Sequence, residues 1–411
     1  MAPGPKTTPR LFKQQSDCCG CGACASACPK NAIDMITDSH GFKYPVIRPS
    51  LCIGCNNCIN SCGLQLRLGQ KTKGPWFAGA GKADISKSAS GGTFSALANS
   101  IINKGGCVYG AAYDRTENEI HVCHQRAASN NELKALLNSK YVQSDAKRCF
   151  KDVKEQLKTG RAVFFTGTPC QVAGLKGYLK KDWPNLLTAD LVCHGVPSDQ
   201  LFNDQIHSYE KQYGAKVIDF CFRDKTKGWG HSLIRLTLSD MRTILIPADE
   251  CPYYDLFLKV KTLRDSCYNC PYSSDFRAAD ITLGDFWGVE ESRPDVLYQS
   301  GLTTERGVSC IMANTEKGRL GIQKYGGGLI VREVAFDDIA KFNDQLRHPS
   351  RLPKDRDLYL KRYEKDGWSG IETTWGIRER GVTIRIKTIL KRHLSTKSLL
   401  RLKKLYKKVR H

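Results

Sequence analysis

No run of about 18 apolar residues occurs in this chain of 411 residues, so the sequence offers no segment suited to span a membrane. An apolar signal segment ahead of Cys18 is also missing. Without an export signal, 19 cysteines point to a reducing interior and to metal binding, not to disulfide crosslinks. The sequence therefore predicts a cytoplasmic protein that uses part of its cysteine as metal ligands.

Acidic residues are absent from the end of the chain. Residues 381–411 hold eleven Lys and Arg and no Asp or Glu, against a net charge of +22 for the whole chain. Apolar residues recur there at near-helical spacing, which predicts a basic amphipathic tail over residues 376–411. We interpret the tail as a contact with an anionic membrane on its inner face or with an acidic partner; a helix packed on the body is the alternative. No motif for reading nucleic acid accompanies the charge, so no such partner is expected.

Cysteine itself is abundant, and one spacing of it occurs twice. The pattern C-x2-C-x2-C-x3-C covers Cys18, Cys21, Cys24 and Cys28, with Pro29 behind it, and then Cys52, Cys55, Cys58 and Cys62, with Gly63 in place of the proline. This is the two-cluster ferredoxin pattern, in which the fourth cysteine of each copy ligates the other 4Fe-4S cluster. We expect one cluster on Cys18, Cys21, Cys24 and Cys62, and the other on Cys52, Cys55, Cys58 and Cys28. A zinc site takes four ligands, so eight thiols in this doubled order are more than it needs. Cys19 lies outside the pattern and is not expected to bind a metal.

The order of apolar segments and turns predicts the domain organisation. Residues 1–10 look like a loose leader and residues 11–66 like the ferredoxin domain. After a linker, strand–turn–helix alternations predict a layered α/β (α+β) domain with sites at the strand ends. Within it we expect a charged helix over residues 130–141 and an antiparallel hairpin formed by HSLIRLTLSD and MRTILIPA.

Further motifs in this second domain suggest cofactor chemistry. SGGT at Ser90–Thr93 opens a helix whose N-terminus suits a phosphate, although a plain helix start explains it equally well. Four thiols fall at or near expected turns: Cys170, Cys193, Cys267 and Cys270. A third iron–sulfur cluster, a zinc site and separately buried cysteines are the open alternatives for them.

At these residues the chain resembles the coenzyme F(420) hydrogenase/dehydrogenase beta-subunit family. The resemblance rests on SASGGTFSALA, GTPCQVAGLK, LVCHGVPS and CYNCPYSSDFRAADITLGDFWG, in that order, and covers about residues 76–334. We divide the corresponding domain into residues 76–150 and 151–345. The resemblance implies FAD close to a 4Fe-4S cluster, which favours the cluster interpretation of the four thiols. It also implies a flavin pocket formed by Ser88, Ser90, Gly91, Gly92, Thr93, Tyr141, Gln143, Ser144, Thr166, Gly167 and Thr168.

These cofactors together predict an oxidoreductase. A flavin accepts a hydride as an electron pair, whereas each 4Fe-4S cluster takes one electron, so one chain with both relays electrons between hydride chemistry and single-electron carriers. The expected partners are a redox protein or a small hydride donor, with coenzyme F(420) among the possible substrates. The alternative is a non-catalytic electron-transfer subunit that serves a separate catalytic chain.

Overall fold

The computed structural model describes residues 8–83 and 85–379, which fall into two compact units divided after Pro353. Most of the expected leader (residues 1–10) and of the expected basic tail (residues 376–411) lies outside these residues. Among the described residues, no helix is both long enough and apolar enough to cross a membrane.

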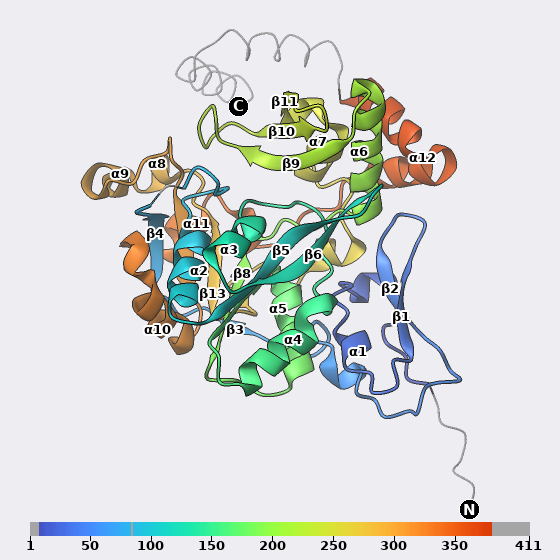
Figure 1. Ribbon diagram of the computed structural model, residues 1–411, viewed down its shortest axis with the longest axis horizontal. Coiled ribbons are helices and arrows are strands. Elements are labelled where there is room, and N and C mark those ends of the chain that lie inside the picture. Colours follow the sequence, from blue (N-terminus) through green and yellow to red (C-terminus); the bar gives the residue numbers. More distant parts are fainter. Residues whose placement is uncertain (1–7, 84, 380–411) are drawn as a thin grey trace, which may run out of the picture. The chain divides into compact units, whose positions relative to one another are not determined.

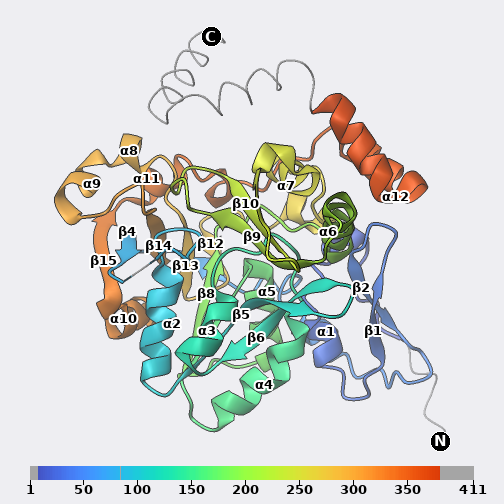
Figure 2. The ribbon, with the colours of Figure 1, turned by 45° about the horizontal axis from the view of Figure 1, so that its top comes forward.

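The first unit is built on a mixed sheet of eight strands (Figures 1 and 2). Its order is β15 (Leu329–Val334), β4 (Trp76–Gly81), β14 (Ser309–Ala313), β13 (Ile281–Asp285), β8 (Leu186–Leu191), β7 (Val163–Gly167), β5 (Cys107–Arg115) and β6 (Ile120–Ala127). The four strands β13, β8, β7 and β5 run parallel to one another, and the outer strands pair antiparallel. Parallel neighbours end at the same edge, so the turns after β7, β8 and β13 meet there.

Alternate residues of the strands bury opposite faces of the sheet. Val108 and Phe164 pack under α2 (Thr93–Asn103), α3 (Asn130–Leu136) and α10 (Glu316–Tyr325). Their neighbours Tyr109 and Phe165 face α4 (Lys147–Lys158) and α5 (Pro169–Leu179) on the other side. A central strand covered on both faces is mostly apolar, which is why β7 begins with VFF and β8 with LL. The layered α/β fold expected from the sequence is confirmed.

The ferredoxin part is a small layer of its own, and it packs against α5. It contains the hairpin of β1 (Ile33–Thr37) and β2 (Lys43–Ile47), helix α1 (Ala23–Ser26) and the 3-10 turn η2 (Ile59–Ser61). A Cβ on Gly63 would lie 2.1 Å from the Ala173 carbonyl oxygen, and one on Gly177 would lie 2.4 Å from that of Ser61. Neither position has room for a side chain, so Gly63 replaces the usual proline because backbone meets backbone there.

A three-stranded antiparallel sheet, β11–β10–β9, follows helix α6 (Asp199–Tyr213). The expected hairpin is confirmed: β10 (Leu233–Leu238) pairs antiparallel with β11 (Thr243–Pro247), and β9 (Val217–Asp224) lies on the other side of β10. Further short elements include α7 (Pro252–Leu258), η4 (Asp265–Asn269), α8 (Val289–Ser292), α9 (Pro294–Ser300), α11 (Phe336–Ala340) and the pair β3 (Gln70–Lys71) and β12 (Phe276–Arg277).

The helix expected over residues 130–141 is wrong in its second half. A capping box formed by Ser129 and Glu132 starts α3, which ends at Leu136. Asn138 then adopts a left-handed backbone with φ of 68°, and its side-chain oxygen accepts a hydrogen bond from the Ser139 amide at 2.7 Å. Asparagine tolerates this conformation and competes locally for backbone groups, so the chain leaves the helix as an irregular segment.

A buried polar network joins the ends of β8 and β13. Arg277 and Asp190 are almost fully buried and form an ion pair at 2.7 Å. Asp190 also accepts hydrogen bonds from the Thr282 hydroxyl at 2.5 Å and the Ala279 amide at 3.2 Å. Arg277 additionally donates to the Leu191 carbonyl oxygen at 2.7 Å. This network fixes the backbone just before the turn that carries Cys193.

The second unit begins at Lys354 and contains α12 (Arg356–Arg378). Its helical backbone is interrupted at Gly367, which has φ of 62°. The Tyr359 hydroxyl donates to the Glu379 carboxylate at 2.9 Å within this unit.

Candidate functional site

Six cysteines line one cavity: Cys18, Cys19, Cys21, Cys24, Cys58 and Cys62. Among them are the four expected for one cluster, Cys18, Cys21, Cys24 and Cys62, which we call the first ferredoxin site. Cys62 reaches it from the second repeat. Burial, followed by the neighbouring Cys18 and Cys62 thiols, raises the pKa of Cys24 to about 12. Thiols packed this closely in an apolar setting ionise favourably only when a positively charged metal core binds them.

The other four cysteines of the two repeats line a second cavity, the second ferredoxin site: Cys28, Cys52, Cys55 and Cys58. Burial raises the pKa of Cys58, and the nearby Cys55 and Cys28 thiols act in the same direction. The Ala32 amide donates a hydrogen bond to the Cys28 sulfur at 3.2 Å. Cys55 is exposed, unlike the other seven cysteines of the two sites.

Three turns at the sheet edge bring together the inner thiol site: Cys170, Cys193, Cys267 and Cys270. Cys170 lies in the first turn of α5 after β7, Cys193 follows β8, and Cys267 belongs to η4 with Cys270 at its end. Burial raises the pKa of Cys193 to about 12, and Cys170 and Cys270 add to the rise. Burial likewise raises the pKa of Cys267 strongly, with Cys193 and Cys170 contributing. The four thiols are therefore close neighbours.

No three His, Cys, Asp or Glu side chains of residues 8–83 and 85–379 converge tightly enough to hold a single metal ion. The cysteines of the two ferredoxin sites surround cavities instead. A cavity bordered by four thiols suits a cubane cluster, whose corners hold the four ligands apart, better than it suits one tetrahedral ion. The residues present therefore fit iron–sulfur clusters.

Cys19 lies between the first ferredoxin site and the inner thiol site. Its thiol is buried and interacts with the thiols of Cys170 and Cys21. The Cys170 thiol lowers the pKa of Cys19, but the Cys21 thiol and burial outweigh it, so the pKa lies well above its usual value. Its only sequence signal is its adjacency to Cys18, and the spacing argument leaves it out. The structure makes it the contact between the first ferredoxin site and the inner thiol site.

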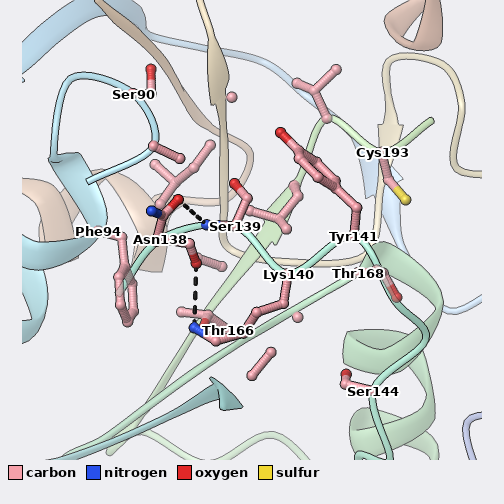
Figure 3. A pocket seen from close by; sticks show the side chains of 18 of the residues that line it. Ser90, Phe94, Asn138, Ser139, Lys140, Tyr141, Ser144, Thr166, Thr168 and Cys193 are labelled. Carbon is pink, nitrogen blue, oxygen red and sulfur yellow. Dashed lines mark hydrogen bonds between the residues drawn. The ribbon is translucent and has the colours of Figure 1, made fainter. Parts of the chain in front are cut away.

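A cavity of about 280 Å³ lies at the same edge of the sheet, and we call it the edge cavity (Figure 3). Nine of the eleven residues expected at a flavin line it: Ser88, Ser90, Gly92, Thr93, Tyr141, Ser144, Thr166, Gly167 and Thr168. Gly91 and Gln143 do not line it. The Gly91 amide donates to the Ser309 hydroxyl at 3.1 Å, and the Gln143 side chain turns toward the Cys19 carbonyl oxygen at 2.9 Å.

The edge cavity also contains residues that the sequence does not single out for it. Cys193 and His194 border it from the turn after β8, and Asp285 from the end of β13. Figure 3 shows Lys140 in the irregular segment after α3. Burial lowers the pKa of Lys140 to about 8. Its amine donates to the Leu137 carbonyl oxygen at 2.7 Å, so a cation stands at the cavity wall.

A buried hydrogen-bond network supports one wall of the edge cavity. His124 Nε2 lies 2.8 Å from the Thr166 carbonyl oxygen, which can only accept, so this nitrogen carries the proton. His124 Nδ1 then accepts from the Ser144 hydroxyl at 3.0 Å, and Gln171 donates to the same hydroxyl at 2.9 Å. The histidine is only 3% exposed and stacks on Phe165. The neutral imidazole thus holds two residues of the cavity wall, Thr166 and Ser144, in position.

Acid is expected to weaken the native state through His124. Burial lowers its pKa from 6.5 to about 4, so between these values the unfolded chain binds a proton that the native chain does not. The stability it contributes is present above pH 6.5 and is lost as the pH falls toward 4, by about 3 kcal/mol in total. His124→Gln should flatten this part of the pH dependence, measured as urea midpoints at pH 7 and 4.5. The exposed His207→Gln is the control, and equal slopes in both variants would contradict the role.

Comparison with known proteins gives two family matches. Residues 160–330 match the family model for the C terminus of the coenzyme F(420) hydrogenase/dehydrogenase beta subunit, and residues 17–64 match the 4Fe-4S dicluster domain. The resemblance read from the motifs is thereby confirmed, and a ferredoxin domain stands at the N-terminal end of the described chain. The two matches support an oxidoreductase with iron–sulfur electron transfer.

Among solved structures, one similar chain comes from the F(420)-reducing [NiFe] hydrogenase complex of Methanosarcina barkeri. It is 17% identical, and the similarity covers 77% of this chain and 95% of that chain with a TM-score of 0.44. No curated protein matches this chain.

Proposed function

We propose that the chain is an iron–sulfur flavoprotein oxidoreductase that relays electrons between hydride chemistry at a bound FAD and three 4Fe-4S clusters. One observation carries the proposal: Cys193 borders the edge cavity and belongs to the inner thiol site. A flavin in that cavity would lie against a cluster ligand. Bound FAD would supply the exchange between an electron pair and single electrons.

The residues of the edge cavity suit a flavin and its phosphates. Gly92 caps the N-terminus of α2, an eleven-residue helix, and the free amides of its first turn favour a phosphate. Lys140 adds a positive charge on the same cavity. Three residues at the end of β7 line the cavity: Thr166, Gly167 and Thr168. Their backbone and hydroxyl groups could form hydrogen bonds to the edge of the flavin ring. Tyr141 stacks on Phe257 with 4.8 Å between ring centroids and closes an apolar side.

From the edge cavity the proposed path runs through the three thiol sites. The inner thiol site would hold one cluster, and Cys19 connects it to the first ferredoxin site. Cys58 lines the cavities of both ferredoxin sites, so the second follows directly on the first. Exposed Cys55 marks the second site as the point where a redox partner exchanges electrons. A cytoplasmic partner protein or a small hydride donor would stand at the two ends of this path.

The direct test is to purify the full chain without oxygen and follow flavin absorbance as reduced coenzyme F(420), NADH, NADPH or reduced ferredoxin is added. We expect a bound flavin that one soluble hydride donor bleaches within seconds, followed by reduction of the clusters. If reduced ferredoxin alone bleaches the flavin, electrons enter through the clusters and the flavin passes them on to a substrate. Absence of flavin from protein with full iron content would overturn the proposal and leave a non-catalytic electron-transfer subunit.

Filling the edge cavity should remove the flavin and spare the iron. Ser139 is half-buried on the cavity wall, so Ser139→Trp places an indole where the cofactor is proposed to lie. Overpacking costs about 1–3 kcal/mol, which corresponds to a loss of flavin affinity of about 5- to 150-fold. The flavin-to-iron ratio measures the effect. Thr243→Trp, at an exposed position on β11, is the matched control. Equal ratios in the two variants would show that the flavin binds elsewhere.

A further inference from the structure

Arg264 extends from the body of the chain into the ferredoxin part and is completely buried there. It immediately precedes η4, which carries Cys267. Its Nε donates to the Cys18 carbonyl oxygen at 2.8 Å, and one terminal nitrogen donates to the Lys43 carbonyl oxygen at 3.0 Å. The other terminal nitrogen donates to Gln143 Oε1 at 3.2 Å.

The ferredoxin part is shaped around this guanidinium. Its central carbon lies 4.0 Å from the centre of the Tyr44 ring, in cation–π contact. Gly20, at φ of 68°, leaves space for the guanidinium, since a Cβ there would lie 2.9 Å from the same carbon. Any other residue at position 20 would need a strained backbone and would collide with the arginine.

The charge of Arg264 has no carboxylate partner. All three acceptors are neutral oxygens, and no Asp or Glu side chain in the described part of the chain forms an ion pair with it. Two other buried arginines differ: Arg277 pairs with Asp190 at 2.7 Å, and Arg223 pairs with Asp285 at 3.1 Å. An unpaired charge in the interior is costly, so a native protein that keeps one compensates it with another anion.

Arg264 contacts the backbone of expected ligands in two sites. Its Nε binds the carbonyl oxygen of Cys18, in the first ferredoxin site. Its own carbonyl oxygen accepts a hydrogen bond at 2.9 Å from the amide of Cys267, in the inner thiol site. Arg264 therefore stands between one ligand of each of two neighbouring sites.

We propose that Arg264 is the shared counter-charge of the clusters in the first ferredoxin site and the inner thiol site, and that it raises the reduction potential of both. For the inner thiol site this rests on the function proposed above. Each cluster with four thiolates is anionic, and its negative charge grows by one when an electron is added. A fixed cation stabilises that added charge, and a buried one is screened little by salt.

The shared position also bears on the transfer between the two sites. The electron that leaves one cluster is the electron that the other gains, and Arg264 keeps its proton throughout because a guanidinium does not deprotonate in proteins. Since the same cation stabilises the added charge on either side, moving the electron does not separate it from its counter-charge. Arg264 thus acts as a tuning residue and takes no part in bond making.

Redox titration of the full-length, anaerobically purified protein, followed by electron paramagnetic resonance, tests this role. We expect Arg264→Gln to lower the reduction equilibrium constant of both clusters about tenfold, which is 59 mV for a one-electron couple. The cluster of the second ferredoxin site should shift less and serves as an internal reference. Arg48→Gln also removes one positive charge, from an exposed position of the ferredoxin part. It should shift the reduction potential of each of the three clusters by less than Arg264→Gln shifts the two clusters beside it.

Arg264→Lys separates charge from hydrogen-bond geometry. A lysine keeps the charge and loses the fork of three donors, so we expect both potentials to remain within about threefold of wild type in equilibrium constant. A tenfold fall in the reduction equilibrium constants of the two clusters in Arg264→Lys would overturn the proposal. Unchanged potentials in Arg264→Gln would overturn it as well. If Arg264→Gln does not retain its clusters, Arg264→Lys decides alone. A wild-type protein without an inner-site signal would contradict the proposed function, and the first ferredoxin site would then decide the role of Arg264.

Discussion

Anaerobically purified Cys267→Ala is expected to contain about eight iron atoms per chain where the wild-type protein contains about twelve. The thiol is buried beside Cys193, Cys170 and Cys270, and removing one of four ligands should release the inner cluster. Flavin should stay bound, because Cys267 does not line the edge cavity. A hydride donor should then bleach the flavin while the two ferredoxin clusters stay oxidised, since their path to it is interrupted.

Cys107→Ala provides the matched control for this experiment. Cys107 is fully buried and lies in the strand core between α4 and the sheet, away from the three thiol sites. It should keep about twelve iron atoms and normal reduction of all clusters. Twelve iron atoms in Cys267→Ala would show that the inner thiol site holds no cluster. Eight iron atoms and one zinc in the wild-type protein would assign that site to zinc.

Asp190→Ala is expected to destabilise the first unit by about 3–5 kcal/mol. The substitution leaves the Arg277 guanidinium buried without its carboxylate, and it removes the acceptor of the Thr282 hydroxyl and the Ala279 amide. Because the network fixes the end of β8, the turn that carries Cys193 should loosen as well. The measurement is the urea midpoint of the full chain by circular dichroism, together with iron content.

An exposed ion pair gives the comparison for Asp190. Asp182 pairs with Lys317 at 2.5 Å, but its side chain is 78% exposed, so Asp182→Ala should cost at most about 1 kcal/mol. Replacing both buried partners, as in Asp190→Leu with Arg277→Met, should recover much of the loss, since no uncompensated charge then remains. Equal destabilisation by Asp190→Ala and Asp182→Ala would show that the buried network contributes little.

The parts of this chain that sequence alone predicts are those with local causes. Cluster ligands recur at short fixed intervals because a loop must wrap one corner of a cubane, so the spacing around Cys18 and Cys52 is readable. The parallel strands can be predicted because strands covered on both faces are mostly apolar. Their shared edge then places Cys170 and Cys193 near each other.

The parts that sequence does not predict depend on contacts between distant segments. Arg264 is 246 residues from Cys18, and nothing in its surroundings marks it as more than a surface arginine. Gln143 belongs to the expected flavin pocket, yet its side chain reaches Cys19, 124 residues away. Lys140 was hidden by the expected helix, because the single left-handed residue Asn138 turns the chain toward the cavity.

The close backbone contact between Gly63 and α5 has a consequence for how electrons travel. Many electron carriers swing between a loading and an unloading position, and the slow step is then the motion of a domain. Here the backbone at Gly63 and at Gly177 is in direct contact with the backbone across the interface. A hinge movement would first have to break this contact. We therefore expect the ferredoxin part to exchange electrons without a domain movement, at a spacing between its thiols and those of the inner thiol site that folding sets.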